Sequence, residues 1–261
     1  MTPGALEAAL RARRAEGRKA VVPYMTGGFD EQWTDVVRAM ADAGADAIEI
    51  GIPFSDPVMD GPVVQEASQR ALDAGTTPPA VLDGLAGLHP GVPVAVMTYY
   101  NLVFRAGHER FAASLRRAGV AGAIVPDLPL EEAGPWLDAA AAAGVDAVLL
   151  AAPTGDDDRL RRVAGRSSGF VYGVGLLGVT GERAALATTA VDVARRLKAV
   201  TDRPVLVGVG ISTPEQAAEV CRVADGVVVG SALVRRLLDG AGPEEAAAFV
   251  AGFRRALDGS G

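Results

Sequence analysis

Eight short runs with strand-like composition alternate with segments of helical periodicity along the whole chain, and this alternation restricts the fold more than any other feature. The expected strands are residues 20–25, 46–53, 92–100, 122–128, 146–153, 170–175, 204–210 and 226–232. The main helical segments are residues 33–43, 78–88, 109–118, 131–142, 156–165, 187–200, 214–222 and 243–257. Strands that alternate with helices build parallel sheets, and eight such units close into a barrel. We therefore predict an α/β protein with a (β/α)8 TIM barrel.

Chain length and loop lengths agree with this prediction. A barrel of about 250 residues would use all 261 residues as a single domain. The alternative is an open doubly wound sheet, but no Gly-x-Gly-x-x-Gly sequence follows the first expected strand.

Residues 1–19 predict an extra N-terminal helix. The loops after the second and sixth strands are long, residues 54–61 (before an extra helix over 62–72) and residues 176–189. Loops of this kind are commonly lids or binding loops.

Composition argues against several kinds of partner. The formal net charge is −7 and no block of basic residues occurs, so nucleic acid and anionic membranes are poor partners. No apolar run is long enough to form a membrane span. The single cysteine, Cys221, excludes an internal disulfide and fits a small core residue. The start of the chain does not read as a signal peptide, so we expect a cytoplasmic protein.

Lysine and histidine are scarce, and their positions restrict the chemistry. The chain contains Lys19, Lys198, His89 and His108, and none of them falls at the carboxyl end of an expected strand. Schiff-base catalysis needs a lysine in the site, and zinc sites commonly use histidine. We therefore expect no metal, and no pyridoxal phosphate attached to this chain.

The second expected strand carries a carboxylate inside an apolar run. Alternation along residues 45–53 places Glu49 on the face opposite Ile48 and Ile50. If the isoleucines face the covering helices, Glu49 points into the barrel. An unpaired carboxylate there costs roughly several kcal/mol, so a purely structural role is hard to justify. We predict that Glu49 is catalytic.

Two further aspartates follow strands and have structural interpretations of their own. Asp60 lies on the loop after the Glu49 strand, where a second carboxyl group would complete a pair suited to proton transfer. It also precedes Gly61 and Pro62, which is typical of a helix N-cap, so both interpretations of Asp60 stay open. Asp127 ends the fourth strand, and a helix cap is sufficient to explain it.

Glycine-bearing turns follow the last three expected strands. They are residues 178–181, residues 208–212 and the pair Gly230-Ser231, which stands just before a short helix over 232–238. Backbone N–H groups at a helix N-terminus bind phosphate without a lysine, and the loops after strands 7 and 8 of a barrel often do so. Glycines also serve tight turns alone. Three such turns on one rim nevertheless predict a phosphate site.

Apolar and aromatic side chains near the strand ends predict a pocket for a flat ring. These residues are Tyr24, Met97, Tyr99, Ile124 and Tyr172. Each alone is more often a core residue. Together with two acids and a phosphate site, they predict a substrate with a hydrophobic body and a phosphate tail. Because no lysine or histidine lies at the carboxyl end of an expected strand, Schiff-base and histidine-metal mechanisms are disfavoured. The remaining mechanism is metal-free acid–base catalysis by carboxyl groups.

These motifs resemble those of the tryptophan synthase alpha chain family, in order, from about Leu6 to Leu257. The matching segments are residues 49–62, 100–104, 126–129, 178–181, 208–212 and 230–232. The resemblance implies reversible retro-aldol cleavage of indole-3-glycerol phosphate to indole and glyceraldehyde 3-phosphate, in tryptophan biosynthesis. It implies no cofactor in this chain. It also implies a beta-chain partner that holds pyridoxal phosphate, in an alpha-beta-beta-alpha heterotetramer.

The resemblance also implies the role of each matching residue. Glu49 is expected to protonate the indole carbon that bears the side chain and then to shuttle a proton for the glycerol hydroxyl. Asp60 is expected to hold the indole N–H proton, positioned by Thr180 of a lid. The expected phosphate-binding residues are Gly181, Gly210, Gly230 and Ser231. The expected substrate-binding residues are Tyr24, Met97, Tyr99, Ile124, Tyr172, Thr180 and Val209.

The chain departs from the family pattern at three places. Residues 175–177 are Gly-Leu-Leu where a polar segment is usual, and Val209 and Tyr24 stand where phenylalanine is common. Two alternatives to an alpha chain remain open. One is a free-standing indole-3-glycerol-phosphate lyase of secondary metabolism, and the other is a catalytically weak module that activates a beta chain. The presence of Glu49 and Asp60 argues against the second.

Overall fold

Eight parallel strands form a closed barrel in the computed structural model, which describes residues 3–175, 183–208 and 210–259. Each strand pairs with its neighbour in the chain, and β8 pairs with β1 to close the ring. The strands are β1 Ala20–Thr26, β2 Ile48–Gly51, β3 Val94–Met97, β4 Gly122–Ile124, β5 Asp146–Ala151, β6 Val171–Val174, β7 Val205–Gly208 and β8 Gly226–Val229. The prediction of a (β/α)8 barrel is confirmed.

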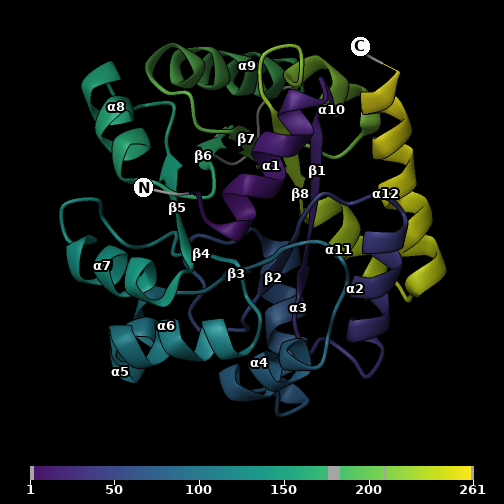
Figure 1. The fold of residues 1–261 in the computed structure, drawn as a ribbon. Helices are drawn as coiled ribbons and strands as arrows, with labels where there is room; N and C mark the ends of the chain where they lie inside the picture. Colours follow the sequence, from purple (N-terminus) through teal and green to yellow (C-terminus); the bar gives the residue numbers. More distant parts are fainter. Residues whose placement is uncertain (1–2, 176–182, 209, 260–261) are drawn as a thin grey trace.

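Helices surround the barrel on all sides (Figure 1). They are α1 Ala5–Ala15, α2 Trp33–Asp42, α3 Pro62–Asp73, α4 Pro78–Ala86, α5 Tyr100–Ala106, α6 His108–Arg117, α7 Gly134–Ala143, α8 Asp157–Arg166, α9 Arg183–Val200, α10 Pro214–Val220, α11 Ser231–Leu238 and α12 Pro243–Asp258. In α2 the buried residues Trp33, Val36, Val37 and Met40 follow helical spacing and form one apolar stripe. None of the helices within the described ranges has the length and apolarity needed to cross a membrane.

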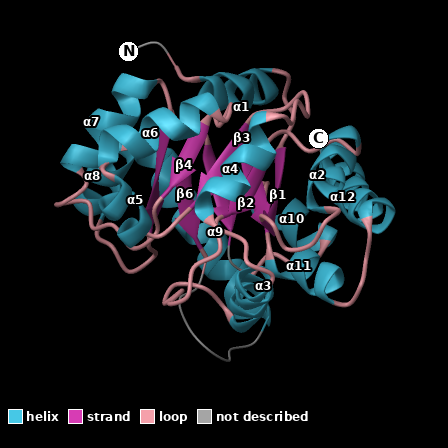
Figure 2. Cartoon of the chain, turned by 90° about the horizontal axis from the view of Figure 1, so that it is seen from below, coloured by secondary structure: helices cyan, strands magenta, loops and turns pink. Residues whose placement is uncertain are grey.

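The two ends of the barrel differ in the elements that cover them. Figure 2 shows α1 at one end of the strands and α3 and α11 towards the other. The side chain of Leu6 on α1 packs closely against Gly122 and Gly169, which have no side chain to keep it out. Helix α1 therefore closes the amino-terminal end of the barrel. The helix expected at the N-terminus is therefore present and blocks access to the interior from that side.

Buried aspartates fix the amino-terminal end of the barrel. Asp46 Oδ2 accepts a hydrogen bond from the backbone N–H of Val21 at 2.7 Å, and Asp225 Oδ2 accepts one from Val205 at 2.9 Å. Asp46 also forms ion pairs with Arg13 at 2.6 Å and Arg254 at 2.9 Å. Each aspartate ties the start of its own strand to the preceding strand. Ionic groups at this end therefore serve the fold, which leaves the opposite end for chemistry.

The chain after β3 differs from the sequence prediction, and several other strands are shorter than expected. The third strand was expected over residues 92–100, but β3 ends at Met97 and α5 begins at Tyr100. The carboxylate of Asp127, at the end of β4, accepts a hydrogen bond from the backbone N–H of Tyr100 at 2.8 Å. Asp127 is thus a helix cap as expected, but for the helix after β3. A cap supplied from a neighbouring strand leaves no local sequence signal.

Candidate active site

A cavity of about 930 Å³ opens at the carboxyl ends of the strands. The expected site residues that line it are Tyr24, Glu49, Asp60, Met97, Ile124, Tyr172, Gly210, Gly230 and Ser231. They come from β1, β2, β3, β4 and β6 and from the loops after β2, β7 and β8. Thr180, Gly181 and Val209 lie outside the described residues. The structure therefore brings nine of the expected residues to one cavity.

Glu49 lies inside the barrel, and one of its carboxyl oxygens has no hydrogen-bond partner among the described residues. Its Cα pairs with Tyr24 on β1 and Ala95 on β3, while Ile48 and Ile50 alternate to the other face. The side chain is 1% exposed, and Oε2 has no hydrogen-bond partner among the described residues. Burial, with a smaller contribution from the charge of Asp60, raises the pKa of Glu49 to about 8. At neutral pH the group is therefore a carboxylic acid with a proton to give.

Asp60 faces the same cavity and does not cap a helix. The N-cap residue of α3 is Gly61, and no side chain caps that helix, so the helix-cap interpretation of Asp60 is wrong. Burial raises the pKa of Asp60 to about 6, against the lowering effect of a hydrogen bond from Tyr99. At neutral pH Asp60 is therefore mainly an anion. The two carboxyl groups thus have different protonation states in one cavity, which is the arrangement that an acid and a base require.

Tyr99 supports Asp60 and is not among the cavity-lining residues within the described chain. Its hydroxyl accepts a hydrogen bond from the backbone N–H of Met59 at 3.0 Å, and its interaction with the Asp60 carboxylate lowers the pKa of that group. Its ring stacks on Phe54 with the ring centroids 5.0 Å apart. Tyr99 was expected to line a ring pocket, and its contacts instead fix the loop that carries Asp60. No sequence signal connects Tyr99 with residue 60.

The turns after β7 and β8 form an electropositive rim without a free basic side chain. Ser231 begins α11, so the first N–H groups of that helix have no acceptor within it, and Ser231 and Ala232 line the cavity. Gly210 has a φ of 89°, which favours glycine. Among the described lining residues the one basic side chain, Arg159, is paired with Glu131 at 2.7 Å. An anion at this rim would therefore be held by backbone N–H groups.

The remaining wall of the cavity is apolar. Register places Ile124 and Met97 side by side, and Leu150 beside Tyr172. A Cβ atom at Gly208 would overlap the hydroxyl of Tyr172, so glycine on β7 makes room for that ring. Leu150, Val174, Pro126 and Leu128 also line the cavity and were missed by the sequence analysis. Strand alternation continued from Tyr172 would have found Val174, whereas Leu150 is placed by the register between β5 and β6.

The family model described as tryptophan synthase alpha chain matches residues 10–256. The chain belongs to this family. Among curated members, the alpha chain of Streptomyces coelicolor is 46% identical over 242 residues, covering 91% of this chain and 89% of the relative. The alpha chain of Gloeobacter violaceus is 45% identical over 261 residues, covering 98% and 94%.

Solved structures of the family have the same fold. A chain of Mycobacterium tuberculosis tryptophan synthase superposes with a TM-score of 0.90 at 36% identity, covering 98% of this chain and 99% of that one. The tryptophan synthase alpha subunit of Legionella pneumophila superposes with a TM-score of 0.88 at 30% identity, covering 99% and 100%. The resemblance inferred from the motifs is confirmed.

Replacement of Glu49 by glutamine is expected to change how stability depends on pH. The pKa of Glu49 is about 8 in the folded protein against 4.5 ordinarily, so between these values the folded state binds the extra proton. That stabilisation is fully present below pH 4.5 and is lost as pH rises through 8. From pH 4.5 to pH 9, the unfolding free energy of the wild type should therefore fall by about 3–5 kcal/mol relative to Glu49→Gln.

Urea denaturation of both proteins at several pH values measures this difference. Asp60 titrates in both proteins, so the difference between them reports on residue 49 and on its smaller electrostatic coupling to Asp60. Stabilities that run parallel across this range would contradict a protonated, buried Glu49.

Proposed function

We propose that this chain cleaves indole-3-glycerol phosphate to indole and glyceraldehyde 3-phosphate, as the alpha chain of a tryptophan synthase. One observation carries the proposal: a neutral carboxylic acid and an ionised carboxylate face the same apolar cavity, with the N-terminus of α11 on its rim. Glu49, as an acid, can protonate the indole carbon. Asp60, as a carboxylate, can accept a hydrogen bond from the indole N–H, and the backbone N–H groups of the rim can bind the phosphate. The apolar wall provides a place for the ring.

The reaction follows from these protonation states. Glu49 donates its proton to the indole carbon that carries the glycerol side chain, and the ring becomes cationic. Asp60 hydrogen-bonds the ring N–H and stabilises the positive charge as it develops. Glu49, now a carboxylate, removes the proton of the adjacent glycerol hydroxyl. The carbon–carbon bond breaks, its electrons restore the neutral indole, and the aldehyde leaves. Glu49 is protonated again, so each turnover returns both groups to their starting states.

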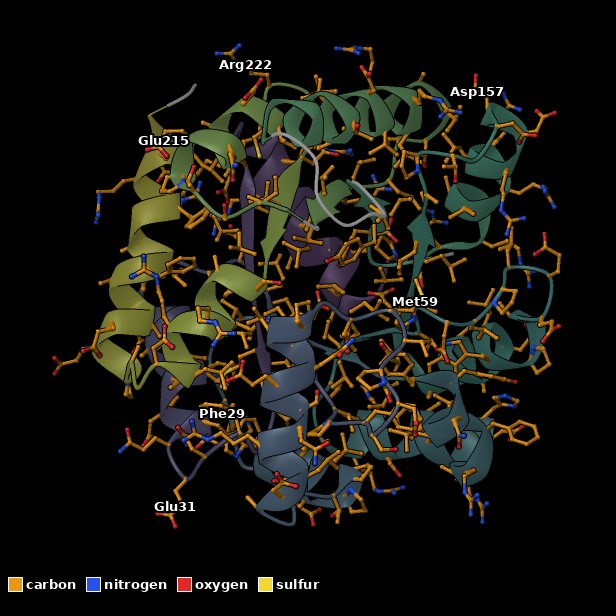
Figure 3. The ribbon with its side chains drawn as sticks, turned by 180° about the vertical axis from the view of Figure 1, so that it is seen from behind. Phe29, Glu31, Met59, Asp157, Glu215 and Arg222 are labelled. Carbon is orange, nitrogen blue, oxygen red and sulfur yellow. The ribbon has the colours of Figure 1, made fainter. Side chains whose placement is uncertain are left out.

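The surface beside the site supports a protein partner. The large hydrophobic side chains that are exposed in the described structure are Val58, Met59 and Phe104, at 80%, 43% and 66%. Val58 and Met59 lie on the loop before α3, and Figure 3 labels Met59 there. Val58 and Met59 are adjacent in the chain, and exposed apolar side chains that adjoin one another are typical of a contact surface. We propose that a beta chain carrying pyridoxal phosphate binds here, in a heterotetramer. Because the same loop bears Asp60, docking would act directly on the catalytic pair.

The first test is the release of indole from indole-3-glycerol phosphate by the purified chain, with and without a beta chain. The Glu49→Gln variant is expected to lower kcat by about 10²–10⁴-fold, because it can neither give nor take the proton. The Glu244→Gln variant, on exposed α12, serves as a matched control and should keep full activity. Unchanged cleavage by Glu49→Gln would exclude the proposed mechanism. Full activity without the beta chain would instead favour the free-standing lyase.

The partner surface is tested by the Phe104→Asp variant. Phe104 lies on α5, outside the cavity lining that the structure describes, so its substitution should leave the activity of the isolated chain unchanged. A charge buried in an interface opposes binding, so stimulation by the beta chain should fall at least about 10-fold. The Phe104→Leu control should retain stimulation. Equal stimulation of wild type and Phe104→Asp would show that the beta chain binds elsewhere.

A further inference from the structure

The ring of Tyr24 spans the distance between the phosphate rim and the catalytic strand. Its Cα pairs with that of Glu49, and a Cβ atom at Gly51, two residues further along β2, would overlap its hydroxyl. On the other side, a Cβ atom at Gly230 would lie 3.4 Å from Cδ1 of the same ring. Tyr24 thus touches both the turn after β8 and the strand that carries Glu49. The ring therefore lies between these two points.

The Tyr24 hydroxyl has a proton to donate. Burial raises the pKa of Tyr24 well above its usual range, so the phenol stays neutral at physiological pH. The Thr26 hydroxyl stands beside it. The hydroxyl oxygen of Thr26 nevertheless has no hydrogen-bond partner within the described chain. Tyr24 lines the cavity, so its donor is open to a ligand. A phenylalanine, common at this position in the family, would offer no such group.

The substrate has one polar group that the proposed mechanism leaves without a partner. The phosphate lies at Gly230 and Ser231, and Glu49 takes the proton of the hydroxyl next to the ring. The hydroxyl on the middle carbon of the linker lies between these points, in a cavity with a largely apolar wall. A polar group that loses water without gaining a hydrogen bond weakens binding. Tyr24 lies between the turn after β8 and the strand that carries Glu49, which is the stretch that the linker spans in the proposed mechanism.

We propose that Tyr24 is a specificity-determining residue whose phenol donates a hydrogen bond to the middle hydroxyl of the three-carbon linker. This inference rests on the proposed function. Gly51 makes the contact geometrically available, because any side chain there would displace the phenol. The consequence is selectivity: the site distinguishes a hydroxylated linker from one that carries hydrogen at the middle carbon. A site that hydrogen-bonds a substrate hydroxyl rejects the analogue that lacks it.

The test compares two proteins with two substrates, in the presence of the beta chain. The proteins are the wild type and Tyr24→Phe, and the substrates are indole-3-glycerol phosphate and its analogue without the middle hydroxyl. For the natural substrate, Tyr24→Phe should lower kcat/KM about 10-fold, which corresponds to one hydrogen bond. For the analogue, the two proteins should agree within about twofold. This coupling separates a direct contact from a general change in the site.

The Tyr100→Phe variant is the matched control, because its phenol bonds His108 at 3.0 Å and does not line the cavity described here. It should behave as wild type with both substrates. If Tyr24→Phe slows both substrates equally, its phenol only supports the barrel, and if it slows neither, the contact does not exist. Either result overturns the inference while leaving the proposed function intact. Failure of the wild type to cleave the natural substrate would instead remove the proposed function, and this inference with it.

Discussion

A carboxyl group without a counter-charge in the interior of a barrel is the constraint on which the rest of this structure depends. Glu49 is 1% exposed, one of its oxygens has no partner among the described residues, and α1 covers the amino-terminal end of the barrel. Burial of the ionised form would be costly, so the group keeps its proton at neutral pH. That proton is what the chemistry uses. The barrel therefore creates the acid by excluding everything that would stabilise its conjugate base.

Asp60 carries the same functional group as Glu49 but has the opposite protonation state at neutral pH. Asp60 is also buried enough for its pKa to rise, but Tyr99 donates a hydrogen bond to it, and its pKa stays near 6. Tyr99 is itself held by Met59 and Phe54, on the loop that carries Asp60. The difference between acid and base thus follows from the more complete burial of Glu49 and from the interaction of Asp60 with Tyr99. It depends on a loop that also carries the exposed side chains of Val58 and Met59.

Sequence reasoning predicted what depends on local pattern and failed where a distant residue decides. The barrel follows from the alternation of strands and helices, and the inward direction of Glu49 follows from the alternation of side chains along its strand. The structure agrees with both. The cap interpretation of Asp60 failed because Gly61 is the N-cap residue of α3. Tyr99, from the end of the next strand, interacts with the Asp60 carboxylate instead. α5 was missed because its cap, Asp127, belongs to another strand. The roles expected for Thr180, Gly181 and Val209 stay predictions.

The difference in protonation between Glu49 and Asp60 is the central claim, and a carbon-13 NMR titration of side-chain carboxyl groups tests it most directly. The Glu49 signal is assigned by its absence in Glu49→Gln. The claim predicts a midpoint of about 8 for Glu49, above a midpoint of about 6 for Asp60. A midpoint for Glu49 near the ordinary value of 4.5, or below that of Asp60, would contradict it.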